Sequence, residues 1–287
     1  MNRPQRIAAI HDLSGFGRCS LAVIIPVLSA MGMQVCPVPT AVLSTHTGGM
    51  GEVALRDLTD YLSPALAHYK KLGLDFECVY SGFLNSPEQI DHCLEFFKSY
   101  PDALAVVDPV MGDHGKVYRT VTALMRQRMH ELVAVADVIT PNLTEACMLL
   151  GESYQTTPLT RNDAKSKLVR LSKLGPNCVV VTGVGLASGE AMVNIGYDRA
   201  RGTFWYIPCD YVPASYPGTG DLFAAVLTGA LLQNDSLPMA MARATHFAQA
   251  AIKTTYGYGT DTRFGVMLEP LLGQLATHQV YADYQTL

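Results

Sequence analysis

Residues 215–225 combine the residue types that could hold and transfer a phosphoryl group. They read Ser-Tyr-Pro-Gly-Thr-Gly-Asp-Leu-Phe-Ala-Ala, a glycine turn followed by an apolar helix with a carboxylate in its first turn. Gly218 and Gly220, with Thr219 between them, allow tight positive-φ conformations, so that the amides at the helix start can converge on an anion. Asp221 would then face an incoming hydroxyl and accept its proton. The same residues also fit an ordinary helix start, where Asp is favoured by the helix dipole.

Two further loops carry carboxylates directly after expected strands. Asp108 and Asp113 lie five residues apart around a Pro and a Gly, in a turn that could aim both at one cation such as Mg²⁺. Pro and Gly also form an ordinary turn at the end of a strand, and this loop taken alone favours that structural interpretation. Asn142 and Glu145 have the spacing of a helix N-cap and its capping-box partner. The functional alternative places Glu145 near the metal and its waters.

Composition bounds the class of protein. The 287 residues are 49% hydrophobic and 16% charged, enough to bury a large core as one α/β domain spanning residues 1–287. The net charge of −4 offers no basic footprint for nucleic acid or for an anionic membrane, so small-molecule partners are expected. The longest apolar run, residues 21–33, is too short to span a bilayer. Seven scattered cysteines argue against a zinc site or disulfides and for a reducing cytoplasm.

Short β-rich runs alternate with helical ones, which predicts a parallel sheet covered by helices. The expected strands are Ile7–Ile10, Gln34–Pro37, Phe76–Ser81, Ala103–Asp108, Asp137–Thr140, Cys178–Thr182, Ala191–Ile195 and Phe204–Pro208. The expected helices run from a capping box at Ser86 to about Ser99, from Arg161 to Gly175, and over Gly218–Leu232, Pro238–Thr254 and Val266–Ala276.

Ligands of such sheets bind at the carboxyl ends of the strands, where four more features fall. The first strand leads into an expected polar, glycine-bearing loop, residues 11–20, which is not a P-loop. His46, in a second polar loop, could orient a substrate, although a lone loop histidine is more often a capping or surface group. Phe83 could stack on a flat substrate, although core packing is its usual role. Thr182 offers a hydroxyl before a glycine turn.

Taken in order, these loops resemble a known family. The pieces Asp-Pro-Val-Met-Gly-Asp at 108–113, Thr-Pro-Asn-Leu-Thr-Glu at 140–145 and Gly-Thr-Gly-Asp-Leu-Phe at 218–223, with Ser-Thr-His-Thr-Gly at 44–48 upstream, look like the pyridoxal kinases of the ribokinase-like superfamily. The resemblance covers nearly the whole chain. It implies a three-layer α/β/α fold with a central, mostly parallel sheet. It also implies ATP-dependent phosphorylation of the 5′-hydroxymethyl group of a vitamin B6 vitamer, with Mg²⁺, often a monovalent cation such as K⁺, and a homodimer.

The resemblance also implies roles for individual residues. Asp221 would be the base, and the amides from Gly218 to Gly220 the anion hole. Asp113 and Glu145 would form the metal and phosphate neighbourhood. The remaining nucleotide-binding positions would be Asp108, Thr140, Asn142, Thr182 and, in a flap, Tyr118. The acceptor ring would lie among His46, Thr47 and Phe83.

Asp12 is an informative departure from the family pattern. Pyridoxal kinases usually carry Ser there, whereas hydroxymethylpyrimidine kinases of thiamine synthesis have an Asp in a similar loop. If Asp12 reaches the acceptor ring, its carboxylate favours acceptors that present a donor such as an amine. The residues after the Gly-Thr-Gly turn and the Thr47 loop favour a B6 kinase, so we rank hydroxymethylpyrimidine kinase second. Another sugar or nucleoside kinase of the superfamily ranks well behind, because its double-Gly opening is absent near the N-terminus.

A protein that binds nucleotide or pyridoxal phosphate without turnover is the alternative from another class. Such a protein would be expected to lose Asp221 or its glycine turn, and both are intact. The enzyme is therefore the favoured interpretation.

Overall fold

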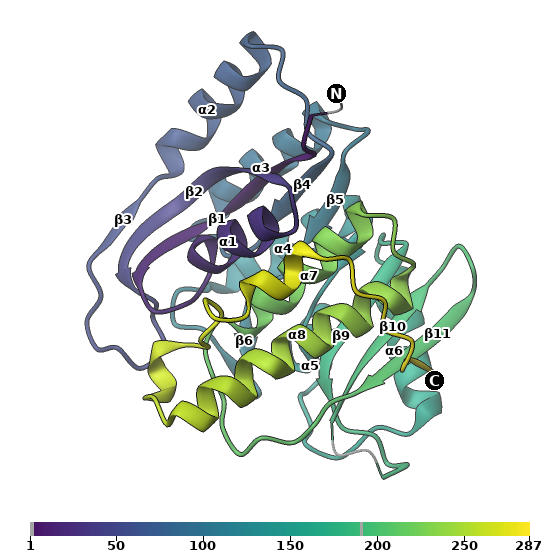
Figure 1. The fold of residues 1–287 in the computed structure, drawn as a ribbon. Helices are drawn as coiled ribbons and strands as arrows, with labels where there is room; N and C mark the ends of the chain where they lie inside the picture. Colours follow the sequence, from purple (N-terminus) through teal and green to yellow (C-terminus); the bar gives the residue numbers. More distant parts are fainter. Residues whose placement is uncertain (1–2, 190–191) are drawn as a thin grey trace.

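A single large sheet forms the middle of the molecule. The computed structural model describes residues 3–189 and 192–287. The strands of this sheet are β1 Arg6–Phe16, β2 Gln34–Thr45, β3 Leu55–Asp57, β4 Cys78–Ser81, β5 Leu104–Val107, β8 Val138–Ile139, β9 Cys178–Val184, β10 Val193–Asp198, β11 Thr203–Pro208 and β12 Gln285–Thr286. They lie in the order β12-β11-β10-β9-β8-β5-β4-β1-β2-β3, and the stretch from β9 to β2 is parallel (Figure 1). The remaining strands add to both edges in antiparallel fashion.

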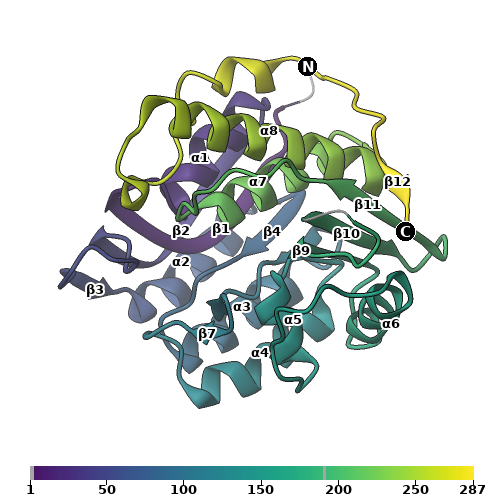
Figure 2. The same cartoon turned by 90° about the horizontal axis from the view of Figure 1, so that it is seen from below.

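Helices cover both faces of the sheet, as Figure 2 shows. On one face lie α1 Leu21–Ala30, α7 Thr219–Leu232 and α8 Leu237–Tyr258. On the other face lie α2 Thr59–Lys71, α3 Pro87–Ser99, α4 Ala123–Val135, α5 Leu143–Leu149 and α6 Arg161–Ser172. This confirms the predicted three-layer α/β/α fold.

The central strands are apolar on both sides because each faces a helical layer. In β1, Ala8 and Ile10 pack into the core beneath α2 to α6, while Ile7 and Ala9 pack into the core beneath α1, α7 and α8. All four are fully buried. The alternation along one strand therefore fastens both layers to the same backbone.

The first two strands are longer than predicted. Residues 11–16, expected as loop, continue β1, and β2 runs on to Thr45. The two extensions pair with each other, Leu13 opposite Val42 and Phe16 opposite Thr45, past an irregularity in register between His11 and Leu13. The polar residues of this segment gave no local signal for a strand, because its hydrogen-bonding partner lies about thirty positions away in the sequence.

Two local predictions are wrong. The helix expected over Val266–Ala276 is only the 3₁₀ helix η2, Leu272–Ala276, because Val266 and Leu268 bury their side chains from irregular backbone. The capping box at Ser86 does not form, since Ser86 makes no side-chain cap and Gln89 Oε1 accepts from the Asn85 amide.

The other predicted helices are present within a few residues, as are the strands. Helix α6 ends at Ser172 rather than at the Gly-Pro pair, and α8 runs four residues further than expected. Ala191, the first residue of one predicted strand, lies outside the described residues, and β10 begins at Val193. Among the described residues, no helix is both long enough and apolar enough to cross a membrane.

Candidate active site

The order of the strands reverses at β1, which has β2 on one side and β4 on the other. Such a switch point opens a crevice at the carboxyl ends of the strands. Strand β1 pairs with β4 only over Ile7–Ile10 and continues beside β2 alone. His11 and Asp12 therefore emerge where the two pairings separate, and Gly82 follows β4 at the same edge.

Two helix N-termini meet beside this crevice. Gly218, the N-cap of α7, has φ of 80°, and a Cβ built on it would lie 1.8 Å from the carbonyl oxygen of Arg18. Ser20, the N-cap of α1, also has a positive φ, 58°, which is a strained conformation for a residue with a side chain. The Ser20 amide donates to Asp221 Oδ2 at 2.7 Å. The starts of α1 and α7 are thus joined through the Asp221 carboxylate.

Gly218 and Gly220 differ in what they require. The predicted positive φ is confirmed for Gly218, but it is wrong for Gly220, which is not among the positive-φ glycines. A Cβ on Gly220 would meet no atom within 4 Å. Gly218 is thus required by the protein's own backbone, whereas Gly220 leaves open space over the first turn of α7, where helix amides can approach an anion. Thr219 between them donates its hydroxyl to the Tyr216 carbonyl.

Asp221 and Asp12 are bridged by a histidine. His11 Nδ1 lies 2.9 Å from Asp12 Oδ1, and His11 Nε2 lies 3.1 Å from Asp221 Oδ1. The His11 ring is 2% exposed and the Asp221 side chain 13%. Burial lowers the pKa of His11, but the two carboxylates outweigh burial and raise that pKa to about 10. The two carboxylates therefore favour the protonated ring. Nε2 lies at ion-pair distance from Asp221 without the geometry of a hydrogen bond, and the Asp12 amide approaches Nδ1 at 3.0 Å.

The Asp12 carboxylate forms one end of this bridge. Besides His11 it accepts a hydrogen bond from the Ser14 hydroxyl at 3.0 Å, and it is buried. Burial raises its pKa, but the contacts with His11 and with Ser20 and Ser14 hold the pKa below the usual range of an aspartate. The structure thus gives Asp12 protein partners, while its predicted contact with the acceptor ring stays a prediction.

Asp108 directly follows β5 and lies close enough to Asp221 to sense its charge. Burial raises its pKa to about 7, and the negative charge of Asp221 adds to the rise. His11 and the Thr140 hydroxyl, at the end of the neighbouring strand β8, offset part of it. The structure therefore brings three of the predicted residues, Asp108, Thr140 and Asp221, to one edge of the sheet.

Glu145 and Asn142 form the predicted capping box at the start of α5, which is confirmed. Glu145 Oε2 accepts from the Asn142 amide, and Oε1 accepts from the amides of Met111 and Gly112. Asn142 also donates its side-chain amide to the Gly112 carbonyl at 2.8 Å. Burial, and then the charge of Asp108, raise the pKa of Glu145 well above its usual range. This pair ties α5 to the loop after β5.

Asp113 lies in the hairpin of β6 Gly112–Asp113 and β7 Lys116–Val117, a small second sheet. Its carboxylate is 45% exposed and accepts from the His114 amide. Tyr118 follows β7 and is 41% exposed. The protein packed around its hydroxyl, and then the charges of four carboxylates, Glu145, Asp113, Asp221 and Asp108, raise its pKa. The predicted flap residue therefore shares an electrostatic neighbourhood with all of the predicted acids of the nucleotide side.

Asp113 and Glu145 are not equally suited to bind a Mg²⁺ ion that is also held by phosphates. Asp113 is accessible and could bind the ion through water, as Mg²⁺ commonly is bound in proteins. Glu145 is 3% exposed and already accepts three backbone amides, so it fits a supporting role better than a direct ligand. Among the described residues, no group of three or more His, Cys, Asp or Glu side chains could hold a metal ion by itself.

The remaining predicted residues fall into two groups. Thr182 continues the nucleotide edge, since its amide donates to the Pro141 carbonyl at 3.0 Å and it bridges to Asn142. On the predicted acceptor side, His46 donates from Nε2 to the Arg263 carbonyl and accepts at Nδ1 from the Gly48 amide. Both ring nitrogens are therefore hydrogen-bonded to backbone groups. Thr47 is half-buried beside it.

Phe83 is buried directly after β4, yet it belongs to neither apolar core. Its carbonyl accepts a hydrogen bond from the Thr40 hydroxyl at 3.0 Å. The backbone at this strand end is therefore fixed, and the ring is left out of the packing that holds the helical layers. This position suits the predicted place of the ring beside a flat acceptor.

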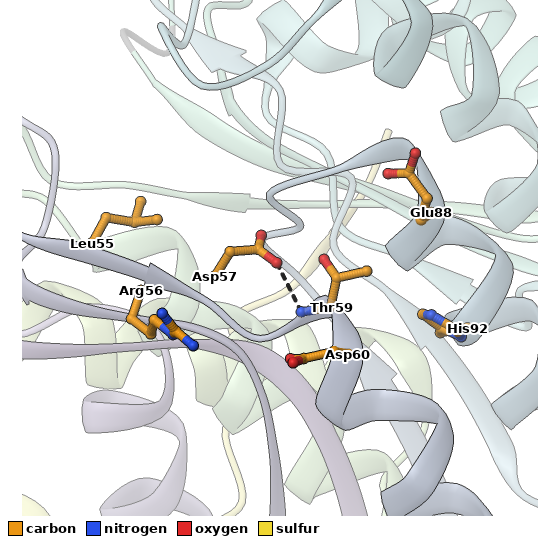
Figure 3. A pocket seen from close by; sticks show the side chains of 7 residues that line it. All are labelled: Leu55, Arg56, Asp57, Thr59, Asp60, Glu88 and His92. Carbon is orange, nitrogen blue, oxygen red and sulfur yellow. Dashed lines mark hydrogen bonds between the residues drawn. The ribbon is translucent and has the colours of Figure 1, made fainter.

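Two hollows lie away from these residues. One of about 650 Å³ lies where β3 meets the starts of α2 and α3, and Figure 3 shows the side chains that line it: Leu55, Arg56, Asp57, Thr59, Asp60, Glu88 and His92. The other, of about 450 Å³, lies between α5 and α6. None of the predicted site residues lines either hollow. The candidate site is therefore defined by strand ends and helix N-termini.

Sequence reasoning missed three residues of the site: His11, Ser20 and Gly82. His11 follows a fully apolar strand and precedes an Asp, and that juxtaposition was an available signal. The roles of Ser20 and Gly82 depend on contacts between segments remote in sequence, so no local pattern could have found them.

Comparison with known proteins identifies relatives of the whole chain. The model of the family described as phosphomethylpyrimidine kinase matches residues 25–265. A crystal structure of a protein from Bacteroides thetaiotaomicron, assigned as a candidate phosphomethylpyrimidine kinase and crystallised with pyridoxal, is 45% identical. The match covers 99% of this chain and 100% of that one, with a TM-score of 0.93.

Two other relatives represent the two activities of the family. Pyridoxal kinase from Lactobacillus plantarum is 34% identical over 96% of this chain and 97% of its own, with a TM-score of 0.86. The bifunctional thiamine biosynthetic enzyme TH1 of Arabidopsis thaliana is 28% identical over 87% of this chain, which spans 46% of that protein. The chain belongs to the family of phosphomethylpyrimidine and pyridoxal kinases, within the ribokinase-like superfamily.

Proposed function

We propose that this protein is an ATP-dependent kinase that phosphorylates the 5′-hydroxymethyl group of a vitamin B6 vitamer, in the salvage of pyridoxal phosphate. One observation carries the proposal: a carboxylate, Asp221, is held at the junction of two helix N-termini, beside the open turn at Gly220. Phosphoryl transfer needs this combination of an anion site and an adjacent base. The similarity to proteins named pyridoxal kinase, and to one crystallised with pyridoxal, supports the choice of acceptor.

The chain's own groups supply positioning and proton transfer. The amides at the start of α7 hold the transferring phosphoryl group, and Asp221 orients the acceptor hydroxyl and takes its proton. Asp113 would help to hold Mg²⁺ together with the nucleotide phosphates, and the ion would neutralise phosphate charge. Thr140, Asn142 and Thr182 border the nucleotide side of the same edge.

Hydroxymethylpyrimidine kinase is the second candidate, favoured by the family model and by Asp12. A carboxylate at that position accepts hydrogen bonds, so direct contact with the acceptor would favour an amine-bearing ring. The protein partners of Asp12 weaken this argument, because both of its oxygens already accept hydrogen bonds.

Further properties belong to the same proposal. We expect a homodimer, use of K⁺ beside Mg²⁺, and a single domain over residues 1–287. We also expect a reducing, cytoplasmic environment, in keeping with seven unpaired cysteines. The most direct test measures ADP production with pyridoxal, pyridoxine, pyridoxamine and hydroxymethylpyrimidine as acceptors. Turnover of the B6 vitamers supports the proposal, turnover of the pyrimidine alone replaces it with the second candidate, and turnover of none overturns it.

A further inference from the structure

His11 is the only residue in contact with both Asp12 and Asp221 among the ion pairs of the described chain. It extends from β1 past the end of the β4 pairing, whereas Asp221 lies on α7 in the opposite half of the sequence. The ring therefore joins the central sheet to the helix that carries the base. A buried ion pair of this kind is retained at a desolvation cost, which calls for a reason beyond stability.

The His11 ring fits in its place because the neighbouring residue at position 82 has no side chain. A Cβ on Gly82 would lie 2.0 Å from His11 Cδ2 and 2.2 Å from Nε2, closer than real Cβ contacts. The Gly82 amide also donates to the Ile10 carbonyl, which keeps the backbone in place. A side chain at position 82 would therefore displace the imidazole from the place in which it reaches Asp221.

The charges facing His11 come from several elements. Asp12 lies on β1 itself, Asp221 on α7 and Asp108 after β5, while the neutral Cys19 and Tyr80 groups lie close enough to sense these carboxylates. His11 therefore stands among three carboxylates, two of which it contacts directly. Without it, Asp221 would face Asp108 uncompensated, and its carboxylate would be held only by the Ser20 amide.

We propose that His11, held by Asp12 and accommodated by Gly82, is a positioning residue that fixes the Asp221 carboxylate in the orientation needed to take the acceptor proton. The inference rests on the proposed function, since it deepens the role of the same base. His11 touches neither substrate nor nucleotide in this scheme. The ion-pair contact of Nε2 restrains Oδ1 and the Ser20 amide holds Oδ2, so in this scheme the carboxylate keeps one orientation toward the acceptor hydroxyl.

Three variants test the bridge at different points. His11→Gln removes the charge, Asp12→Asn weakens the hold on the ring, and Gly82→Ala displaces the ring without changing any polar group. We expect each to lower kcat by about 10- to 100-fold, because small misplacements of a reacting group carry such costs. The KM for ATP should change by less than about twofold, since the nucleotide edge is untouched.

The matched control is His246→Gln. His246 forms a similar His–Asp pair with Asp283, at 2.7 Å, but on the exposed side of α8. We expect wild-type kcat and KM from this variant. If all three bridge variants keep wild-type kcat while folded, as judged by circular dichroism, the inference is overturned. If Asp12→Asn instead reorders the preference among acceptors at unchanged kcat, Asp12 contacts the acceptor and the bridge is again rejected.

A measurement without turnover separates this inference from the proposed function. In ¹⁵N-labelled protein, both ring nitrogens of His11 should give imidazolium shifts at about pH 8, whereas a free histidine is neutral there. Asp221→Asn should move the Nε2 signal in particular. A neutral His11 ring at that pH contradicts the bridge even in a fully active kinase. An imidazolium that senses Asp221 supports it even if no B6 vitamer is phosphorylated.

Discussion

Two groups of buried carboxylates lie within one site, and they are compensated in opposite ways. Asp12 has a pKa held below the usual range because His11 stands against it. Asp108, after β5, and Glu145, in the first turn of α5, have raised pKa values. Burial is the main cause for both, and the charge of Asp221 adds to the rise at Asp108 as the charge of Asp108 does at Glu145. One group is neutralised by the protein itself, and the other is not.

This difference indicates which half of the site needs a bound ligand to balance its charge. A carboxylate with an internal cation is already oriented, as a base must be before the acceptor arrives. Carboxylates that repel each other gain most from an arriving cation, as Mg²⁺ would supply with the nucleotide. On the proposed assignment of the site, His11 preorganises the acceptor side, and binding of the nucleotide completes the other side.

The base should give the largest effect. Asp221→Asn removes the proton acceptor but keeps the shape, so we expect kcat to fall by about a hundredfold or more while ATP binding persists. Steady-state kinetics with an ATP titration would measure both quantities. Near-wild-type turnover would remove Asp221 from the mechanism and end the comparison.

The two glycines of the α7 turn form a matched pair. Gly218→Ala should cost about 3 kcal/mol of stability, because its Cβ meets the Arg18 carbonyl and its φ is positive. Gly220→Ala should leave stability unchanged or raise it by about 0.5 kcal/mol, yet lower activity by crowding the approach to phosphate. Urea unfolding and kcat give both readouts. A folded, fully active Gly220→Ala protein would show that no anion approaches there.

The pH dependence of stability should distinguish the two carboxylate groups. Asp108→Asn removes a charge whose folded pKa is raised, so it should stabilise the protein by about 1 kcal/mol at about pH 8. That gain should shrink as the pH falls through 7 toward the ordinary pKa of 3.8. Asp12→Asn should instead destabilise at neutral pH, by about 3 kcal/mol, because it breaks a buried pair.

The Asp12 penalty should disappear only as the pH falls below 3.8, since the folded pKa of Asp12 is lowered. Melting temperatures across the pH range would compare the two variants directly. Parallel curves of the same sign would mean that the two groups do not differ in compensation.

The metal should give the smallest effect. Asp113→Asn should raise the Mg²⁺ concentration for half-maximal rate by about threefold, as expected for a ligand that acts through water. Glu145→Gln can keep the bond from the Asn142 amide but sets an NH2 group against the amides of Met111 and Gly112. Since Glu145 is buried among these amides, the variant should lower stability while changing the Mg²⁺ requirement less than Asp113→Asn does. Rates measured against free Mg²⁺ at saturating ATP would rank the two. The opposite ranking would make Glu145 the nearer metal group.

The sequence predicted best where neighbours along the chain decide the structure. The apolar strand Ile7–Ile10 and the capping box of Asn142 and Glu145 were both foreseen, because their signals are contained within a few residues. The capping box at Ser86 failed because Gln89 is bonded to Asn85, Thr40 and Thr59, two of which lie far away in the sequence.

Prediction of the site residues likewise depended on whether their signals are local in the sequence. The acids of the predicted nucleotide side were identifiable from turns after strands, and the structure brings Asp108 within electrostatic reach of both Asp221 and Glu145. His11 was not identifiable, because its role depends on Gly82 and Asp221, which join it only once the sheet is assembled. Contacts made across elements are what a single sequence reveals least.

The divided pairing of β1 has a consequence for motion. Ile7–Ile10 is hydrogen-bonded to β4 on one side and β2 on the other, whereas Leu13–Phe16 is bonded to β2 alone. A strand held from one side exchanges its amide hydrogens more readily than one held from both. One continuous strand should therefore show two exchange rates, slow before His11 and faster after it. The acceptor side could then open for entry and release while the core beneath it stays closed.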